Sequence, residues 1–600
     1  MRNRTFGLFS LIFALMPQLQ LAGCGWVTPI DPQPAGWPIA KDVFTTAQQQ
    51  LLPVAIPAST PPLNPADVPL YEPFGYSAWH VGAGTNYSAD PNNPRPYDKR
   101  TDLAPGYTNA PNAARLLSFF SMSDIHIADK ESPAQPIGVG WSAPYGPASA
   151  GLASAYSPII LSTTQVLDAA IQTINALHQK SPFDFGISLG DDINNNQYNE
   201  LRWFIDVLDG QVITPSSGAH VGADTIDYQM PYKAAGLNRA IPWFQVLGNH
   251  DQFWMGSAYE DVKTRQTHIG PFILDMAISA DSASDAVDET GYYMGVVDGS
   301  TSYGDIYGVG PEAYFATPPT VVADADRRAL ATNASSSLNW MGEFFNTTSS
   351  PVGHGFTATN LADDFACYSF EPKSDIPIKV IVLDDTCKGV GQPNYARACL
   401  DQPRLDWLEA ELQDGQDHDK LMIIAAHIPL YPQQTLDPNS GNYSLFSTTS
   451  VIGDLPLLAI LHNYPNLILW ISGHRHVNVV TAQPSADPIN HPEESFWEVE
   501  TSSLRDFPQE FRTCDIRRNG DNTISIIVTD VDPAVAEGSP AAKSRGYAIG
   551  AARIFGATPA TIADTTSHAY NAELVKQLTP EMQAKIVNYG SPLTAADGSD

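Results

Sequence analysis

Five short clusters of polar residues carry side chains of the kinds that bind metal ions. In chain order the clusters are Asp124-Ile125-His126, Gly190-Asp191, Gly248-Asn249-His250-Asp251, Ala426-His427 and Gly473-His474-Arg475-His476. Ligation by a mixture of carboxylate, amide and imidazole suits borderline metals such as Mn, Fe, Zn or Co better than Ca or Mg. The residue types therefore indicate a site for divalent transition metals.

The same residue types are those that hydrolysis of a phosphoester requires. Two cations about 3.5–4 Å apart can lower the pKa of a bridging water, neutralise phosphate oxygens and stabilise the in-line transition state. A carboxylate must bridge two ions held so close together, and neutral imidazole and amide ligands keep the site from becoming too anionic. We therefore expect metal-dependent hydrolysis of a phosphoester.

Each cluster directly follows a short apolar run with the length and composition of a buried strand. The predicted strands are Arg115–Ser121, Phe183–Leu189, Ile241–Leu247, Lys379–Leu383, Lys420–Ala425 and Leu467–Ile471. Helical patterns alternate with them at Ser162–Lys180, Asn199–Leu208 and Gln402–Leu412, which indicates an α/β layered fold. Because ligands of open α/β sheets bind beyond the carboxyl ends of the strands, we expect the five clusters to converge.

The remaining sequence predicts peripheral segments around one large domain. Residues 24–112 form a Pro-rich tether, 113–530 the catalytic domain with an insertion at 255–364, and 531–600 a C-terminal tail. Phe496–Glu500, Phe511–Arg517 and Thr523–Thr529 are predicted as antiparallel strands, and Glu573–Ile586 as a helix of the tail.

Read in order as D-x-H, G-D, G-N-H-D, H and G-H-x-H, the clusters resemble the motifs of the calcineurin-like metallophosphoesterase superfamily. The resemblance extends discontinuously over roughly Ala113 to Asp530. It implies a four-layer α/β/β/α sandwich and a centre of two divalent metal ions. The implied ligands are Asp124, His126 and His476 for the first metal, Asn249, His427 and His474 for the second, and Asp191 as the bridge. His250 resembles the family histidine that contacts phosphate and protonates the leaving group.

The sequence departs from the family pattern three residues after Asp191. Several family members have an aspartate there, which pairs with the acid histidine, whereas this chain has Asn194. An amide can orient an imidazole but cannot stabilise its charged form. Asp192 could take the place of the family aspartate, although its position next to Asp191 would point its side chain elsewhere. Asp251 is expected to have a structural hydrogen-bonding role.

Other polar and aromatic residues are weaker candidates for the site. His354 lies in a Gly-rich loop that could reach substrate or could be an ordinary connection. Arg475 and Arg505 could bind phosphate or could form ion pairs elsewhere. Trp203, Trp243 and Trp340 are expected in the core rather than at the substrate.

The substrate class stays open between phosphomonoesters and phosphodiesters. The alternatives are a 5′-nucleotidase-like enzyme and a surface-anchored binding module that keeps the fold without turnover. The formal net charge of −33 disfavours binding to a nucleic-acid backbone, so we expect a small phosphoester as the substrate.

The first residues are typical of a bacterial export signal. Arg2 and Arg4 precede a short apolar run, Phe6–Met16, and Leu21-Ala22-Gly23-Cys24 resembles a lipobox. We therefore expect a lipoprotein-type signal peptide at 1–23, a lipid on Cys24 and a periplasmic or cell-surface location, with the outer membrane favoured. In an exported chain the four other cysteines permit two disulfides in three connectivities, and Cys387–Cys399 is the most plausible pair.

The lipid anchor can be tested by changing the cysteine that would carry it. Cys24→Ala should abolish metabolic labelling with a fatty acid and release the protein from the membrane fraction. Membrane fractionation identical to that of the unaltered protein would contradict lipidation.

Overall fold

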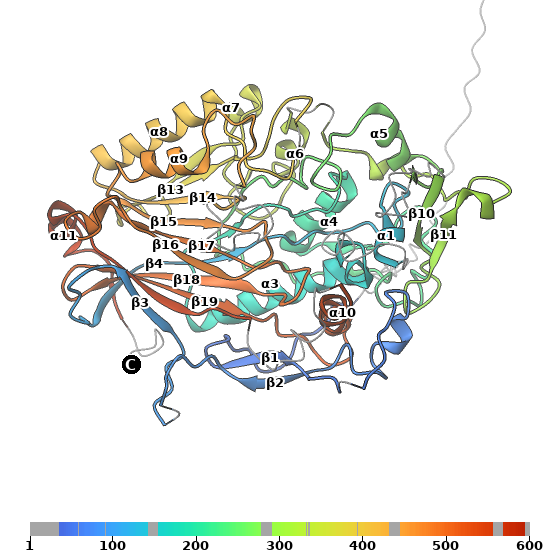
Figure 1. Ribbon diagram of the computed structural model, residues 1–600, viewed down its shortest axis with the longest axis horizontal. Coiled ribbons are helices and arrows are strands. Elements are labelled where there is room, and N and C mark those ends of the chain that lie inside the picture. Colours follow the sequence, from blue (N-terminus) through green and yellow to red (C-terminus); the bar gives the residue numbers. More distant parts are fainter. Residues whose placement is uncertain are drawn as a thin grey trace, which may run out of the picture. The chain divides into compact units, whose positions relative to one another are not determined.

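Two β-sheets packed face to face lie at the centre of the fold (Figure 1). The computed structural model describes residues 35–57, 59–90, 92–141, 154–277, 291–331, 333, 336–392, 394–430, 445–555 and 568–593. The predicted signal peptide and Cys24 lie outside the described residues.

The first sheet has six strands in the order β12-β13-β14-β15-β17-β16. Their bounds are Tyr368–Phe370, Ile378–Leu383, Leu421–Ala426, Leu467–Ser472, Phe496–Glu500 and Val479–Gln483. The four strands from β13 to β17 run parallel. Parallel strands buried on both faces are predominantly apolar, which explains the apolar runs of β13, β14 and β15, whereas β17 also carries Glu498 and Glu500.

The second sheet has eight strands, seven of them in the order β3-β20-β19-β18-β4-β5-β8, and β21 (Ser591–Pro592) pairs with β4. The bounds of the seven are Asp98–Leu103, Ala572–Lys576, Ile524–Val531, Phe511–Asn519, Asn112–Met122, Phe185–Ser188 and Trp243–Gln245. β4, β5 and β8 run parallel to one another. Both sheets therefore contain a group of parallel strands.

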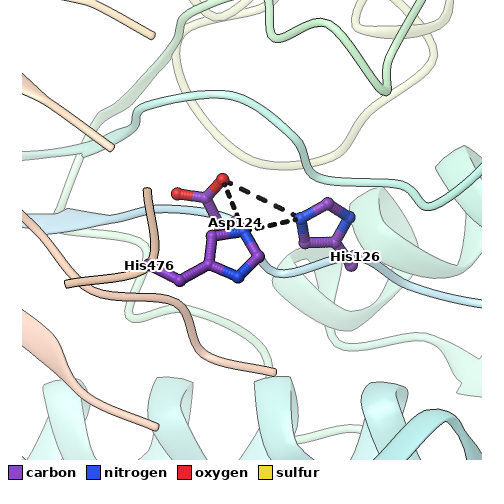
Figure 2. A group of neighbouring side chains, drawn as sticks. All are labelled: Asp124, His126 and His476. Carbon is purple, nitrogen blue, oxygen red and sulfur yellow. Dashed lines mark hydrogen bonds and ion pairs between the residues drawn. The ribbon is translucent and has the colours of Figure 1, made fainter. Parts of the chain in front are cut away.

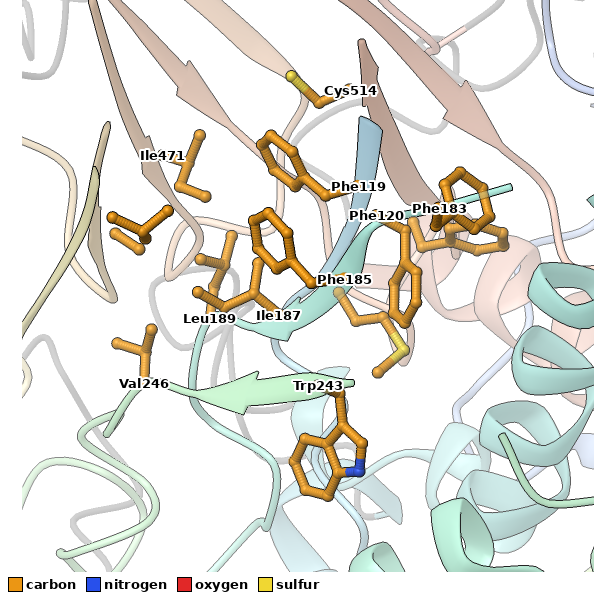
Figure 3. Packing of buried hydrophobic residues seen from close by; sticks show 14 of the residues in the cluster. Phe119, Phe120, Phe183, Phe185, Ile187, Leu189, Trp243, Val246, Ile471 and Cys514 are labelled. Atoms are coloured by element: carbon orange, nitrogen blue, oxygen red, sulfur yellow. The ribbon is translucent and has the colours of Figure 1, made fainter. Parts of the chain in front are cut away.

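Side chains from both sheets meet in one continuous core. Phe119 of β4 and Phe185 of β5 stack with ring centroids 4.8 Å apart, and Ile471 of β15 belongs to the same cluster (Figure 3). Along β13, Val380 belongs to this core and Ile381 to the cluster on the other face of the sheet. This alternation is the strand period of two.

Helices cover the outer face of each sheet. α8 (Gln402–Asp417) and α9 (Asp454–Leu461) pack their leucines on the first sheet, and α3 (Thr163–Lys180) and α4 (Tyr198–Asp209) pack against the second (Figure 1). The order of layers is therefore α/β/β/α, and the fold is of the α/β class.

Three elements differ from the sequence-based expectation. β17 pairs antiparallel with β16, as expected, but on its other side it pairs in parallel with β15, and it lies in a different sheet from β18 and β19. Ala572–Lys576 forms strand β20, and only Pro580–Ile586 of the expected tail helix is helical, as α11. The segment expected to be a tether contributes β1 (Gln49–Pro53), β2 (Trp79–Ala83) and β3, and β3 pairs with β20. Tertiary pairing partners, which the local sequence does not encode, decide all three.

Besides α5 (Val262–Ile269) and two short 3-10 helices at Glu312–Tyr314 and Ala325–Arg327, the described residues of the region expected as an insertion form two structural parts. One is a three-stranded sheet, β9 (Asp275–Ala277), β10 (Gly291–Val297) and β11 (Ile306–Pro311). The other contains α6 (Leu338–Glu343) and α7 (Ala358–Asp363), and Trp340 of α6 is buried in the main core.

The expected Cys387–Cys399 disulfide is absent, because the four cysteines of the described part of the chain are buried free thiols. The two residues share one small apolar cluster, where the Cys387 thiol donates to the carbonyl of Arg397 at 3.3 Å. Within the described residues, no helix is both long and apolar enough to cross a membrane.

Candidate metal centre

The loops that follow five parallel strands bring the predicted ligands together at one edge of the two sheets. Asp124, Asp191 and Asn249 come after β4, β5 and β8 of the second sheet. His427 and His474 come after β14 and β15 of the first. The site therefore lies where the carboxyl ends of both parallel groups meet.

One group of donors consists of Asp124, His126 and His476, whose side chains point toward one another (Figure 2). Asp124 Oδ1 lies 3.8 Å from His126 Nε2 and 3.2 Å from His476 Nε2. The two Nε2 atoms are 3.2 Å apart. These three atoms can bind a single ion.

A second group consists of Asn249, His427 and His474. His427 Nε2 lies 2.9 Å from Asn249 Oδ1 and 3.2 Å from His474 Nδ1. Asn249 Oδ1 and His474 Nδ1 are 3.0 Å apart. This group offers two imidazole nitrogens and one amide oxygen to a second ion.

Asp191 lies between the two groups. Its Oδ2 is 3.3 Å from His427 Nε2 in the second group and 3.8 Å from His126 Nε2 in the first. Its Oδ1 accepts a hydrogen bond from the backbone N–H of His250 at 2.8 Å. One carboxylate oxygen therefore faces both groups of donors.

The charge balance of the site favours a cation. Asp124 Oδ1 is buried and has no hydrogen-bond partner among the described residues, a costly arrangement for a carboxylate oxygen unless a positive charge lies beside it. Burial disfavours protonation of His427 and His476, but the carboxylates of Asp191 and Asp124 outweigh it and raise the pKa of each imidazole to about 10. The donors therefore fit divalent cations in number and in chemical type.

The backbone at the donors adopts a conformation that is rare outside glycine. Five of the seven predicted ligands have positive φ angles: Asp124 (51°), His126 (48°), Asp191 (55°), His474 (74°) and His476 (59°). Each such residue costs on the order of 1–3 kcal/mol, and such residues cluster at functional sites. The loops are thus held in a conformation that aims the side chains inward.

Two motif glycines are required because the loops approach the donors closely. A Cβ at Gly248 would lie 2.2 Å from Asp191 Oδ1, and a Cβ at Gly473 would lie 1.7 Å from Ser123 Oγ and 2.5 Å from Asp124 Oδ2. No side chain fits at these distances. The glycines of G-N-H-D and G-H-R-H therefore make room for the carboxylates.

Hydrogen bonds at the far ring nitrogens orient two of the histidines. His427 Nδ1 donates to the carbonyl of Leu189 at 2.9 Å, which leaves Nε2 free for a metal. His476 Nδ1 donates to the carboxylate of Asp506 at 2.5 Å. Carboxylate and carbonyl partners of this kind fix the tautomer of a metal-binding histidine and raise its basicity.

Asp506 was missed by the sequence analysis. It lies in the loop after β17, and that loop reaches the site because β17 runs parallel to β15. If β17 ran antiparallel to β15, it would have ended at the opposite edge of the sheet. The useful sequence signal was the apolar run Phe496–Glu500 followed by polar residues, as at the other five strands.

His250 lies beside the first group, with its ring edge-on to that of His126 at 4.5 Å between centroids. Its Nδ1 donates to the backbone carbonyl of Asn194 at 2.7 Å. The Asn194 side chain instead accepts from Arg505 Nη1 at 2.7 Å. Because a backbone carbonyl orients the imidazole, the exchange of aspartate for asparagine at position 194 leaves this hydrogen bond intact.

The two aspartates adjacent to the ligands have structural surroundings. Asp251 accepts from the backbone N–H groups of Gly248, Asp191 and Asp192 at 2.8–3.0 Å, and so joins two of the metal-site loops. Asp192 is bonded to Ser188 and Gln245, and burial raises its pKa well above the usual range. Neither carboxylate points at the donors.

The weaker candidates from the sequence lie in or against the core, apart from Arg475, which forms an ion pair. His354 is buried, stacks on Trp243 with centroids 3.5 Å apart and is bonded to Thr347 and the Trp243 carbonyl, so it is part of the core. Arg475 is paired with Glu500. Trp243 and Trp340 are buried, and Trp203 packs partly buried against the same cluster.

Comparison with known proteins adds little to this picture. No family model and no curated protein matches the sequence. Among solved structures, the chain is similar to a dimetal phosphatase from Danio rerio with 10% identity and a TM-score of 0.34, over 70% of this chain and 97% of that one. A match at this level carries no weight for function, and the functional interpretation rests on the geometry of the site.

The role of Asp506 can be tested through metal affinity. Asp506→Asn keeps a hydrogen-bond acceptor for His476 but removes the charge, and should weaken metal binding about 10–100-fold, as loss of such partners typically does. Chelator competition followed by elemental analysis measures this. Asp363→Asn, at an exposed carboxylate of α7, is the matched control. Equal metal affinity in both variants would contradict a positioning role for Asp506.

Proposed function

We propose that the chain is a metal-dependent phosphoester hydrolase with a two-ion centre. One ion would be bound by Asp124, His126 and His476, and the other by Asn249, His427 and His474. Asp191 would bind both ions. The observation that carries this proposal is that a single oxygen, Asp191 Oδ2, faces both groups of donors. A single-ion site would have no use for a second set of donors on the far side of that carboxylate.

When bound, two such ions would supply an activated water and neutralise the charge on the phosphate. The chain itself provides the remaining chemistry. His250 is held through Nδ1, which leaves Nε2 to donate a proton to the departing alkoxide. Burial lowers the pKa of His250, so the proton must be retained by a nearby negative charge, which the phosphate of the substrate would contribute.

Retention of every donor favours an enzyme over a binding module that merely keeps the fold. All seven side chains are present, and the five with positive φ maintain a costly backbone conformation. A protein with no turnover would have no reason to maintain both the complete set of donors and this backbone conformation.

The proposal is tested by assaying p-nitrophenyl phosphate and bis-p-nitrophenyl phosphate with Mn²⁺, Zn²⁺, Co²⁺ or Fe²⁺ added to metal-depleted protein. We expect hydrolysis of at least one ester that a chelator abolishes and the metal restores. Hydrolysis of neither ester with any of the four metals would contradict the proposal.

Two variants separate metal binding from proton transfer. Asp191→Asn should lower the metal content and remove nearly all turnover, because the bridging charge is lost. His250→Ala should retain its metals and lose roughly 10²–10⁴-fold in rate on substrates with poor leaving groups. The loss should be smaller on p-nitrophenyl esters, since p-nitrophenolate hardly needs a proton.

Elemental analysis beside kinetics distinguishes the two effects. Full metal content and activity in Asp191→Asn would refute the two-ion assignment. Loss of metal from His250→Ala would show that His250 is a ligand rather than the acid.

A further inference from the structure

A cavity of about 250 Å³ opens beside the metal site. One wall contains the donor His476 with Arg505, Asp506 and Phe507. The rest of the lining comes from α10 (Pro540–Phe555), a helix of the C-terminal segment, and from Ser154. The cavity thus connects the proposed reaction centre to a helix that carries none of the metal-binding motifs.

Arg505 supplies a buried positive charge to the lining of this cavity. Its side chain is only 2% exposed, Nη1 donates to Asn194 and Nη2 lies 3.3 Å from Asp506. Nε has no hydrogen-bond partner in the part of the chain that the structure describes. A guanidinium in this place can bind a phosphoryl oxygen, because such groups form strong charge-assisted hydrogen bonds.

The helix wall is apolar. Ala548, Ala551 and Ala552 are spaced three and four residues apart and so lie on one face of α10. With Phe507 they present only hydrocarbon. Among the described residues that line the cavity, Arg505 is the only lysine or arginine, so a second phosphate would find no counter-charge there. The part of a ligand that contacts this wall should therefore be apolar and uncharged.

The volume of the cavity further limits which ligands can bind in it. An apolar cavity of about 150 Å³ holds one benzene molecule, whereas pockets for drug-sized ligands measure about 300–1,000 Å³. At about 250 Å³ the cavity holds a phosphoryl group with a single ring or a short alkyl chain. A nucleoside would exceed this volume and find few hydrogen-bonding partners on the alanine wall.

We propose that this cavity is the leaving-group pocket, and that the substrate is a phosphate ester of a small apolar alcohol or phenol. The phosphoryl group would lie at His476 and Arg505, and the alcohol group against Ala548, Ala551 and Ala552. The inference rests on the proposed hydrolase function and adds a substrate class to it.

Binding of non-hydrolysable phosphonates to the metal-loaded protein tests this pocket without reliance on turnover. Titration calorimetry should show that phenylphosphonate binds about tenfold or more tightly than methylphosphonate, because apolar contacts in a fitted pocket change affinity by about 10–200-fold. The affinity for adenosine 5′-monophosphate should be no higher than that for methylphosphonate. Equal affinity for the two phosphonates, or preference for the nucleotide, would overturn the pocket assignment.

Filling the pocket gives a second readout. Ala552 is only partly buried on α10, so Ala552→Leu would place its side chain in the cavity with little disturbance of the core. The variant should lose about tenfold or more in affinity for phenylphosphonate and less than twofold for methylphosphonate. Ala410→Leu, at an exposed alanine of α8, is the control and should change neither. Equal weakening of both ligands by Ala552→Leu would overturn the inference.

Arg505→Met tests the phosphoryl end, with metal content measured in parallel. The variant should bind both phosphonates more weakly, to the same extent, and an unchanged affinity for both would remove Arg505 from the pocket.

The assay with p-nitrophenyl phosphate keeps the two proposals separate. Turnover without discrimination between phosphonates would refute the pocket alone. Discrimination without turnover would refute the hydrolase function and with it the leaving-group assignment, and would leave only a binding pocket for such ligands.

Discussion

Asp191 places a negative charge in a site that is almost closed to solvent, and much of the structure serves to keep it there. Its Oδ2 lies within 4 Å of imidazole nitrogens from both donor groups. Asp124 adds a second buried carboxylate with an unpartnered oxygen. Neutral imidazoles and an amide cannot balance two such charges, since an isolated buried carboxylate is strongly disfavoured. The donors must therefore either take up protons or bind cations, and their shared orientation favours cations.

This requirement also explains why two sheets are needed. β4, β5 and β8 of the second sheet supply one set of loops, and β14, β15 and β17 of the first sheet supply the other. The continuous core between the sheets fixes the separation of the two sets. Left-handed backbone at five ligands and the close approach at Gly248 and Gly473 then place the donor atoms. Packing of the layers thus holds a backbone conformation that the loops alone would not adopt.

Much of this arrangement could be predicted from the sequence, and the failures have a common cause. The apolar runs at Arg115–Ser121 and Leu467–Ile471, for example, lie within β4 and β15. The seven predicted ligands come together because the metal-binding motifs follow such strands directly. The parallel pairing of β17 with β15 was not predicted, and a helix was expected where strand β20 lies, because each pairing involves a partner distant in the sequence. Asp506 was missed for the same reason.

The C-terminal segment shows what motif analysis leaves out. α10 carries no metal-binding motif, yet it packs beside α3 and forms a wall of the cavity at His476. If the proposed pocket is correct, metal binding and substrate preference are encoded in different parts of the chain. The first can be read from residue types at strand ends, and the second would depend on α10, which the sequence motifs do not identify.

The central claim is that one carboxylate joins two metal ions, and anomalous diffraction tests it most directly. Crystals of the protein loaded with Mn²⁺ or Zn²⁺, with data collected on both sides of the metal absorption edge, should show two anomalous peaks about 3.5–4 Å apart. One peak should lie among Asp124, His126 and His476, the other among Asn249, His427 and His474, with Asp191 between them. A single peak, or none at these residues in fully loaded protein, would contradict the account.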